Sequence, residues 1–226
     1  METAHEKFLI NLKDQVIGKS IFIYRTPQDF DKLLVVLDLL KTRGVFPNAL
    51  LDVGANIGAI CIPAVARGLV ERAVAFEPHP LNCTLLQANI ALNNVRRQIT
   101  IVEAAVGASE GGTVELTLSA ENWGDHRVLY PTEQAASVAS REKIAVPVVR
   151  LDTWRDLDGA LVWMDIQGYE GHALKGATKL LSRAPPLVLE FWPEGMEVAQ
   201  SFDALRSAIA HYEGFYDLES PDRLRP

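Results

Sequence analysis

Several features that mark common protein classes are scarce in this sequence. Only two cysteines, Cys61 and Cys83, occur among its 226 residues. Without cysteine or histidine partners at suitable spacings, they predict neither a disulfide framework nor a metal site, and they are typical of a reduced cytoplasmic protein. No apolar run approaches the length of a membrane span, and the N-terminus lacks a basic segment followed by an apolar one. We therefore expect neither a membrane partner nor a signal peptide.

Positive charge is also in short supply. The chain has 22 Lys and Arg against 29 Asp and Glu, which gives a formal net charge of −7. Because nucleic-acid-binding surfaces need an excess of positive charge, we do not expect a nucleic-acid partner. Hydrophobic residues make up 48% of the chain, which is enough for a core. The length suits one α/β domain with a short N-terminal addition.

Two phosphate-binding motifs are missing as well. The sequence has no G-x-x-x-x-G-K-[ST], which argues against a nucleoside triphosphate. The glycine turn that it does have, Gly54-Ala55-Asn56-Ile57-Gly58, differs from the dinucleotide pattern G-x-G-x-x-G and contains no basic residue. The pyrophosphate of a dinucleotide is therefore disfavoured at this turn.

The glycine turn stands between two apolar strands, each with an acid at its end. Asp52 precedes the turn, and Glu77 follows the strand at residues 73–76. A carboxylate offers acceptor oxygens to both hydroxyls of a ribose, while an acid before the turn suits a cationic ligand group such as an amino group or a sulfonium. We predict a nucleoside-binding domain whose cofactor is S-adenosyl-L-methionine. There are two alternatives: the cofactor is NAD, or the glycines of the turn only allow a helix to pack closely against a strand and bind no ligand.

The order of apolar segments predicts an α/β fold with a mostly parallel sheet and helices on both faces. We place an N-terminal cap, made of a strand at 21–24 and a helix at 27–42, in residues 1–44. The S-adenosylmethionine-binding domain follows in 45–226, with an insertion at 108–150 that holds two antiparallel strands and a polar loop at 119–141. The remaining expected strands are 49–53, 73–76, 99–103, 161–165, 187–190 and 215–218; the helices are about 58–68, 80–93, 169–181 and 202–211.

Acids follow five of the expected strands. In an open α/β sheet ligands bind beyond the carboxyl ends of the strands, so these acids should line one edge. Helix capping explains any one of them, but it explains all five together poorly. The five are Asp52, Glu77, Glu103, Asp165 and Glu190. We predict that the cofactor is bound by Asp52, Gly54, Ala55, Asn56, Gly58, Glu77, Pro78, Ala104, Ala105 and Asp165.

An ordered series of motifs between residues 45 and 195 resembles the FkbM-type S-adenosylmethionine-dependent methyltransferases. The motifs are DVGANIG from Asp52, FEP from Phe76, AAVG from Ala104, LDTW from Leu151, MDIQGYE from Met164, LKGA from Leu174 and LEFWP from Leu189. This resemblance implies a Rossmann-like class I methyltransferase fold and O-methylation of a hydroxyl on a small natural-product or sugar acceptor. Family members usually carry Glu where this chain has Gln167, which leaves open a non-catalytic module that only binds S-adenosylmethionine or another adenosine ligand.

The acceptor is expected to meet the polar loop of the insertion. His126 lies there between Trp123, which could form an apolar wall, and Arg127, which could bind a polar or anionic acceptor. We expect His126 or Asp165 to take the hydroxyl proton, with a solvated loop histidine as the alternative. Gln167 and Glu190 are further candidate acceptor-binding residues. A homodimer is left open.

Overall fold

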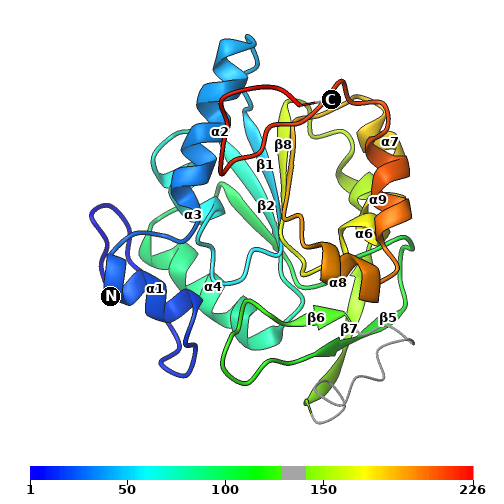
Figure 1. Ribbon diagram of the computed structural model, residues 1–226. Coiled ribbons are helices and arrows are strands. Elements are labelled where there is room, and N and C mark those ends of the chain that lie inside the picture. The colour runs from blue at the N-terminus through cyan, green and yellow to red at the C-terminus, as the bar shows by residue number, and fades with distance from the viewer. Residues whose placement is uncertain (129–140, 226) are drawn as a thin grey trace.

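The computed structural model describes residues 1–128 and 141–225 and is built around a five-stranded parallel sheet (Figure 1). The strand order is β3-β2-β1-β8-β9, with bounds Ile99–Val102, Arg72–Phe76, Ala49–Val53, Ala160–Met164 and Leu187–Leu189. Every residue of β1 and β8 is buried. Buried parallel strands need cover on both faces, so the expected α/β fold is confirmed.

Alternate side chains of these strands enter two apolar cores, one on each face. Leu50 and Leu161 face the core formed with α2 (Phe30–Thr42), α3 (Cys61–Ala66) and α4 (Pro80–Leu92). Leu51 and Val162 face the other core. Its helices, on the opposite side of the sheet in Figure 1, are α6 (Glu170–Lys175), α7 (Thr178–Leu181), α8 (Pro193–Val198) and α9 (Phe202–Ile209).

The N-terminal region corrects one expectation, because residues 21–24 belong to a helix and not to a strand. Helix α1 spans Ile17–Tyr24. The carboxylate of Asp14 accepts the N–H groups of Val16 and Gly18 at 3.1 and 2.7 Å, which satisfies donors at the start of the helix. Ile21 is fully buried, and this packing overrides the strand preference of its β-branched and aromatic neighbours. Helix α2 ends at Thr42 as expected but begins at Phe30, after Asp29 in a left-handed conformation (φ 54°).

The insertion and the two residues of β4 just before it form a second, four-stranded sheet in the order β4-β7-β5-β6. The strands are Ala105–Val106, Lys143–Val149, Thr113–Thr117 and Arg127–Val128. β5 pairs with β7 in antiparallel fashion, which confirms the two expected strands. The two-residue strands β4 and β6 are too short for a sequence pattern to reveal. Residues 129–140 of the expected loop lie outside the described residues. A 3₁₀ turn, Leu151–Trp154, leads back to the main sheet.

The C-terminal third departs from the expected elements in two places. The helix expected at 169–181 is divided into α6 and α7 at Gly176, where a Cβ atom would lie 2.0 Å from the carbonyl oxygen of Gly107. The strand expected at 215–218 is reduced to a single bridge between Phe215 and Arg225, so within the described residues β9 is the last strand at this edge. None of the helices in residues 1–128 and 141–225 has the length and apolar character that crossing a membrane requires.

Candidate functional site

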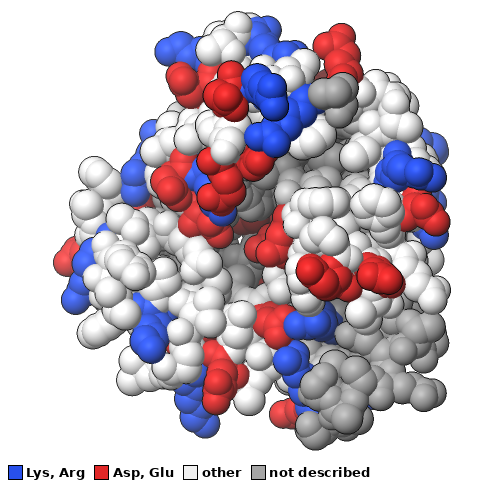
Figure 2. Space-filling view, in the orientation of Figure 1, with Lys and Arg blue, Asp and Glu red and all other residues white. Residues whose placement is uncertain are grey.

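The register of the main sheet aligns the carboxyl ends of its strands. Val53 lies opposite Phe76 on one side and Met164 on the other, so Gly54, Glu77 and Asp165 leave the sheet at one level. A pocket opens there, and Figure 2 shows a hollow near the middle of this face with acidic side chains around it. Its lining includes Asp52, Gly54, Ala55, Asn56, Glu77, Pro78, Ala104, Ala105, Trp123, His126 and Asp165 from the predicted set.

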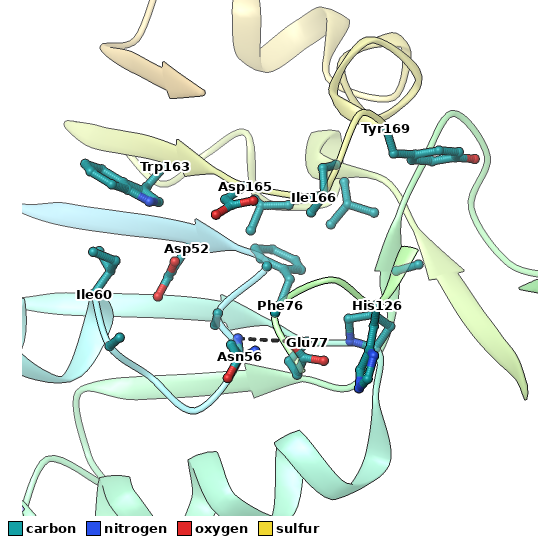
Figure 3. A pocket seen from close by; sticks show the side chains of 18 of the residues that line it. Asp52, Asn56, Ile60, Phe76, Glu77, His126, Trp163, Asp165, Ile166 and Tyr169 are labelled. Carbon is teal, nitrogen blue, oxygen red and sulfur yellow. Dashed lines mark hydrogen bonds between the residues drawn. The ribbon is translucent and has the colours of Figure 1, made fainter. Parts of the chain in front are cut away.

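Glu77 is held by the backbone of two different segments. Its Oε2 accepts the N–H of Asn56 at 2.8 Å (Figure 3). Its Oε1 accepts the N–H of His79 at 2.9 Å. The side-chain amide of Asn82 adds a longer contact of 3.4 Å to Oε1. Burial raises the pKa of Glu77 to about 7. Since a carboxylate has about four lone-pair sites, Oε2 retains one for a ligand hydroxyl.

Asp52 lies on the next strand and is also buried, with 1% of its surface exposed. Its Oδ2 accepts the N–H of Cys61 at 3.1 Å, at the first residue of α3. Burial raises the pKa of Asp52 to about 6. Asp52 therefore stabilises the start of a helix and also presents negative charge to the pocket.

The two glycines of the turn serve the fold in different ways. Gly54 has φ +91°, and a Cβ atom there would lie 1.9 Å from the carbonyl oxygen of Asp165, so the neighbouring strand itself excludes a side chain. Gly58 does not line the pocket; a Cβ atom there would meet Ile62 at 2.5 Å. This position favours a packing role for Gly58 over the expected cofactor contact.

Part of the pocket lining is apolar, and we call this part the apolar slot. Pro78, Ala104 and Ala105 line it as expected, but residues that the sequence analysis missed complete the surface. These include Phe76, Val106, Leu116 and Val128, the last three from the second sheet. The apolar positions of β5 were visible in its polar–apolar alternation, but nothing local showed that they face a pocket. An apolar slot beside a buried carboxylate suits a base attached to a ribose.

His126 lies at the Glu77 end of the pocket. Its ring centroid is 4.4 Å from that of His79, whose backbone N–H binds Glu77. Figure 3 shows His126 near Glu77, with Asp165 across the pocket. Its Nδ1 accepts the N–H of Ser119 at 3.0 Å, so the neutral ring carries its proton on Nε2. That Nε2 is buried and has no hydrogen-bond partner among the described residues.

Burial lowers the pKa of His126 to about 3, so the ring is neutral near pH 7. The nitrogen free to meet a ligand is thus a donor, because the other nitrogen is already an acceptor for Ser119. This geometry favours a hydrogen bond from Nε2–H to a ligand over proton abstraction by His126.

The other loop residues have different environments. Trp123 lines the pocket, and its carbonyl oxygen accepts the side-chain amide of Asn56 at 3.0 Å, which ties the insertion to the glycine turn. Arg127 does not line the pocket: it pairs with Asp125, and its guanidinium lies 4.8 Å from the ring centroid of Trp192. A direct contact of Arg127 with an acceptor in the pocket, as expected from the sequence, is therefore disfavoured.

Asp165 lies on the side of the pocket opposite Glu77 and joins a cluster of polar side chains. Its Oδ1 accepts the Nε2 amide of Gln167 at 2.8 Å, and the same nitrogen donates to Oε2 of Glu190 at 3.0 Å. Burial raises the pKa of Asp165. Burial and the charge of Asp165 raise the pKa of Glu190 to about 8. Neither Gln167 nor Glu190 lines the pocket, so both lie behind Asp165.

The N-terminal cap also reaches the pocket, through residues that the sequence did not single out. Ile17, Gln28 and Asp29 belong to the lining. Oε1 of Gln28 is buried without a hydrogen-bond partner among the described residues. Ile166 and Tyr169 line the pocket from the turn after β8. The cap and this turn therefore both contribute to the wall of the pocket.

Topology and site together define a class of protein. A parallel sheet with β1 at its centre, a glycine turn after β1 and a buried acid after β2 is the arrangement of Rossmann-like class I methyltransferases. The family model for the methyltransferase FkbM domain matches residues 52–215 of the chain. The protein therefore belongs to the FkbM family of S-adenosylmethionine-dependent methyltransferases. S-adenosyl-L-methionine is the cofactor of this class, and the residues present fit it. They provide a buried carboxylate, an apolar slot and the Nε2 of His126, which has no hydrogen-bond partner in the part of the chain that the structure describes.

Among the solved structures that match the chain, two from Pyrococcus horikoshii align over less than half of it. A putative transferase from Pyrococcus horikoshii aligns at 16% identity and a TM-score of 0.35, over 46% of this chain and 35% of that chain. P. horikoshii TYW2 in complex with MeSAdo aligns at 17% identity and a TM-score of 0.26, over 45% and 33%. The matched region is thus about a third of the length of each of these proteins. No curated protein matches the chain.

Proposed function

We propose that the protein transfers a methyl group from S-adenosylmethionine to a hydroxyl of a small natural-product or sugar acceptor. The observation that carries the proposal is the position of Asp165, a carboxylate that lines the pocket on the side away from the ribose carboxylate Glu77. The cofactor supplies an already activated methyl group on a sulfonium. The main tasks of the chain are then to orient the acceptor oxygen and to accept its proton.

Asp165 is the base in this proposal. It borders the pocket, and burial raises its pKa, which brings a carboxylate closer to the proton affinity that a general base needs near neutral pH. His126 has the complementary role of a neutral hydrogen-bond donor at the other end. Loss of a positioned base typically lowers a rate by roughly 10²–10⁴-fold.

The charges of the pocket restrict the acceptor. Among the described residues that line it, the charged side chains are acidic: Asp29, Asp52, Glu77 and Asp165. Since like charges repel strongly where water is scarce, a carboxylate or phosphate on the acceptor is unfavourable here. A neutral polyhydroxylated acceptor fits better, and Gln28 and Asp29 of the cap could hydrogen-bond its further hydroxyls.

The proposal is tested with a panel of hydroxylated acceptors. The protein is incubated with S-adenosylmethionine and each acceptor, and S-adenosylhomocysteine and the methylated product are measured by mass spectrometry. Transfer to a hydroxyl oxygen that is lost in Asp165→Asn but kept in Asp203→Asn, an exposed acid of α9, supports it. Tight cofactor binding without transfer to any acceptor would instead favour the non-catalytic binding module that Gln167 leaves open.

A further inference from the structure

A chain of polar groups leads from the pocket to the surface of the protein. Asp165 lines the pocket, Gln167 bridges it to Glu190, and Glu190 is exposed to solvent. We propose that Asp165 and Glu190 form a proton relay in which Glu190 passes the acceptor proton to solvent, and that Gln167 is the positioning residue that holds the two carboxyl groups together. This inference rests on the proposed O-methylation and adds its proton exit.

The geometry of Gln167 is specific to this bridge. Its backbone is left-handed, with φ +57°, an uncommon conformation for a residue with a side chain. Its single Nε2 donates at 2.8 Å to Asp165 and at 3.0 Å to Glu190. An amide can donate to two carboxylates without bringing a third negative charge, which a glutamate at this position would add.

The turn that carries Asp165 and Gln167 is also fixed from its inner side. Oε1 of Glu170, which is fully buried, accepts the backbone N–H of Ile166 at 3.1 Å and that of Gly168 at 3.3 Å. The two polar side chains of the turn therefore have a rigid support. A relay needs such support, because a proton moves only between groups that stay within hydrogen-bond reach.

The surrounding charges favour one shared proton over two full negative charges. Asp29 and Glu170 raise the pKa of Glu190, in addition to burial and Asp165, while Lys32 acts in the opposite direction on Asp165. Asp52 lies on the neighbouring strand β1, but its carboxylate binds the N–H of Cys61. Lys32 is itself paired with Asp29 at 3.2 Å and with Glu219 at 3.1 Å, so its charge is largely shared with them.

Each methyl transfer releases one proton, and the proposed relay carries this proton to solvent. The acceptor oxygen forms a bond to the methyl carbon as the carbon–sulfur bond breaks, and sulfur keeps that electron pair. The hydroxyl proton passes to Asp165. The proton held by Glu190 leaves to water, and the pair returns to its starting state when one proton is again shared between the two carboxyl groups.

The first test needs no acceptor and no cofactor. The chain is labelled with ¹³C-aspartate, and the carboxyl signal of Asp165, assigned with Asp165→Asn, is followed by NMR as the pH is raised. We expect two steps, the second near the pKa of about 8 at which Glu190 loses its proton. The second step should vanish in Glu190→Gln and persist in Glu194→Gln, an exposed acid of α8. A single step in the wild-type protein overturns the proposal.

The second test uses turnover. Glu190→Gln should lower kcat by roughly tenfold, less than loss of the base itself. Its affinity for S-adenosylhomocysteine should stay unchanged, and small soluble bases such as imidazole should restore part of the rate. Gln167→Glu should move the alkaline limb of the pH–rate profile upward by about one unit, since it adds a like charge beside the pair.

The outcomes separate this inference from the proposed function. If the wild-type protein methylates a hydroxyl and Glu190→Gln keeps the wild-type kcat and pH profile, the relay is wrong and the methyltransferase stands. If no acceptor is methylated, the proposed function fails, and the NMR titration still decides whether the two carboxyl groups share a proton.

Discussion

Replacement of Glu77 by alanine tests the cofactor site most directly. Three donors already bind the Glu77 carboxylate, two of them strong backbone N–H groups and one the longer Asn82 contact. About one lone pair is then left for a ribose hydroxyl. A hydrogen bond to a charged group contributes roughly 1.5–3 kcal/mol, so Glu77→Ala should weaken S-adenosylhomocysteine binding by about 10- to 150-fold.

Calorimetry at pH 8 is the appropriate assay, because the carboxyl group, with a pKa of about 7, is mostly ionised there. The variant should also unfold at a lower temperature, since the N–H groups of Asn56 and His79 lose their acceptor. The binding affinity must therefore be measured at a temperature well below the unfolding transition of the variant, as determined from its thermal unfolding curve.

Glu103 provides the matched control for Glu77. It follows β3, the strand next to β2, and its side chain is exposed and does not line the pocket. Glu103→Ala should change neither the dissociation constant nor the unfolding temperature. A folded Glu77→Ala protein that binds S-adenosylhomocysteine within twofold of the wild-type affinity would show that the ribose is bound elsewhere.

Three further predictions follow from the same geometry. Gly54→Ala should prevent folding or lower Tm strongly, because its Cβ would lie 1.9 Å from a backbone oxygen, while Gly68→Ala, also at positive φ but with open space around it, should cost far less. His126→Ala should weaken cofactor binding by about 2- to 10-fold through loss of one neutral hydrogen bond. It should lower kcat by less than tenfold; a loss of 10²-fold or more would return the role of base to His126. Cofactor affinity should rise between pH 6 and 8, since Glu77 must release its proton to accept a ribose hydroxyl, and a flat calorimetric profile would contradict this.

The central sheet was the most predictable part of the structure. The strand at 49–53 has the expected bounds, and the other parallel strands agree within a residue or two. Buried parallel strands are short, nearly continuous apolar runs, and here each run is followed by a glycine or an acid. The local sequence therefore identifies each segment as a strand and also shows where the strand ends. The register then brings the carboxyl ends together without further information.

The N-terminal helix α1 shows where local sequence is insufficient. Residues 21–24 have the composition of a strand, but a strand needs a neighbour with free backbone groups. The helix is selected by contacts outside the segment, namely the capping by Asp14 and the burial of Ile21. Such contacts become visible only when the chain has folded.

The residues of the proposed acceptor side were named from the sequence, but their orientations were not predictable. The sequence offered His126 and Asp165 as candidate bases and Gln167 and Glu190 as candidate acceptor-binding residues. It could not show that Ser119 occupies Nδ1 of His126, or that Gln167 faces Asp165 and not the pocket. Hydrogen-bond direction depends on side-chain orientation, which no spacing rule fixes.

The two halves of the pocket are held by different kinds of contact. On the cofactor side, Asp52 and Glu77 bind backbone N–H groups of the glycine turn and of helix starts, so their positions follow from the fold itself. On the side that we propose for the acceptor, Asp165 and Glu190 are joined through one side-chain amide, that of Gln167. A single substitution at Gln167 can therefore change the proton affinity of the acceptor side while the cofactor side keeps its geometry. This separation would let the chemistry at the acceptor change without loss of the nucleoside site.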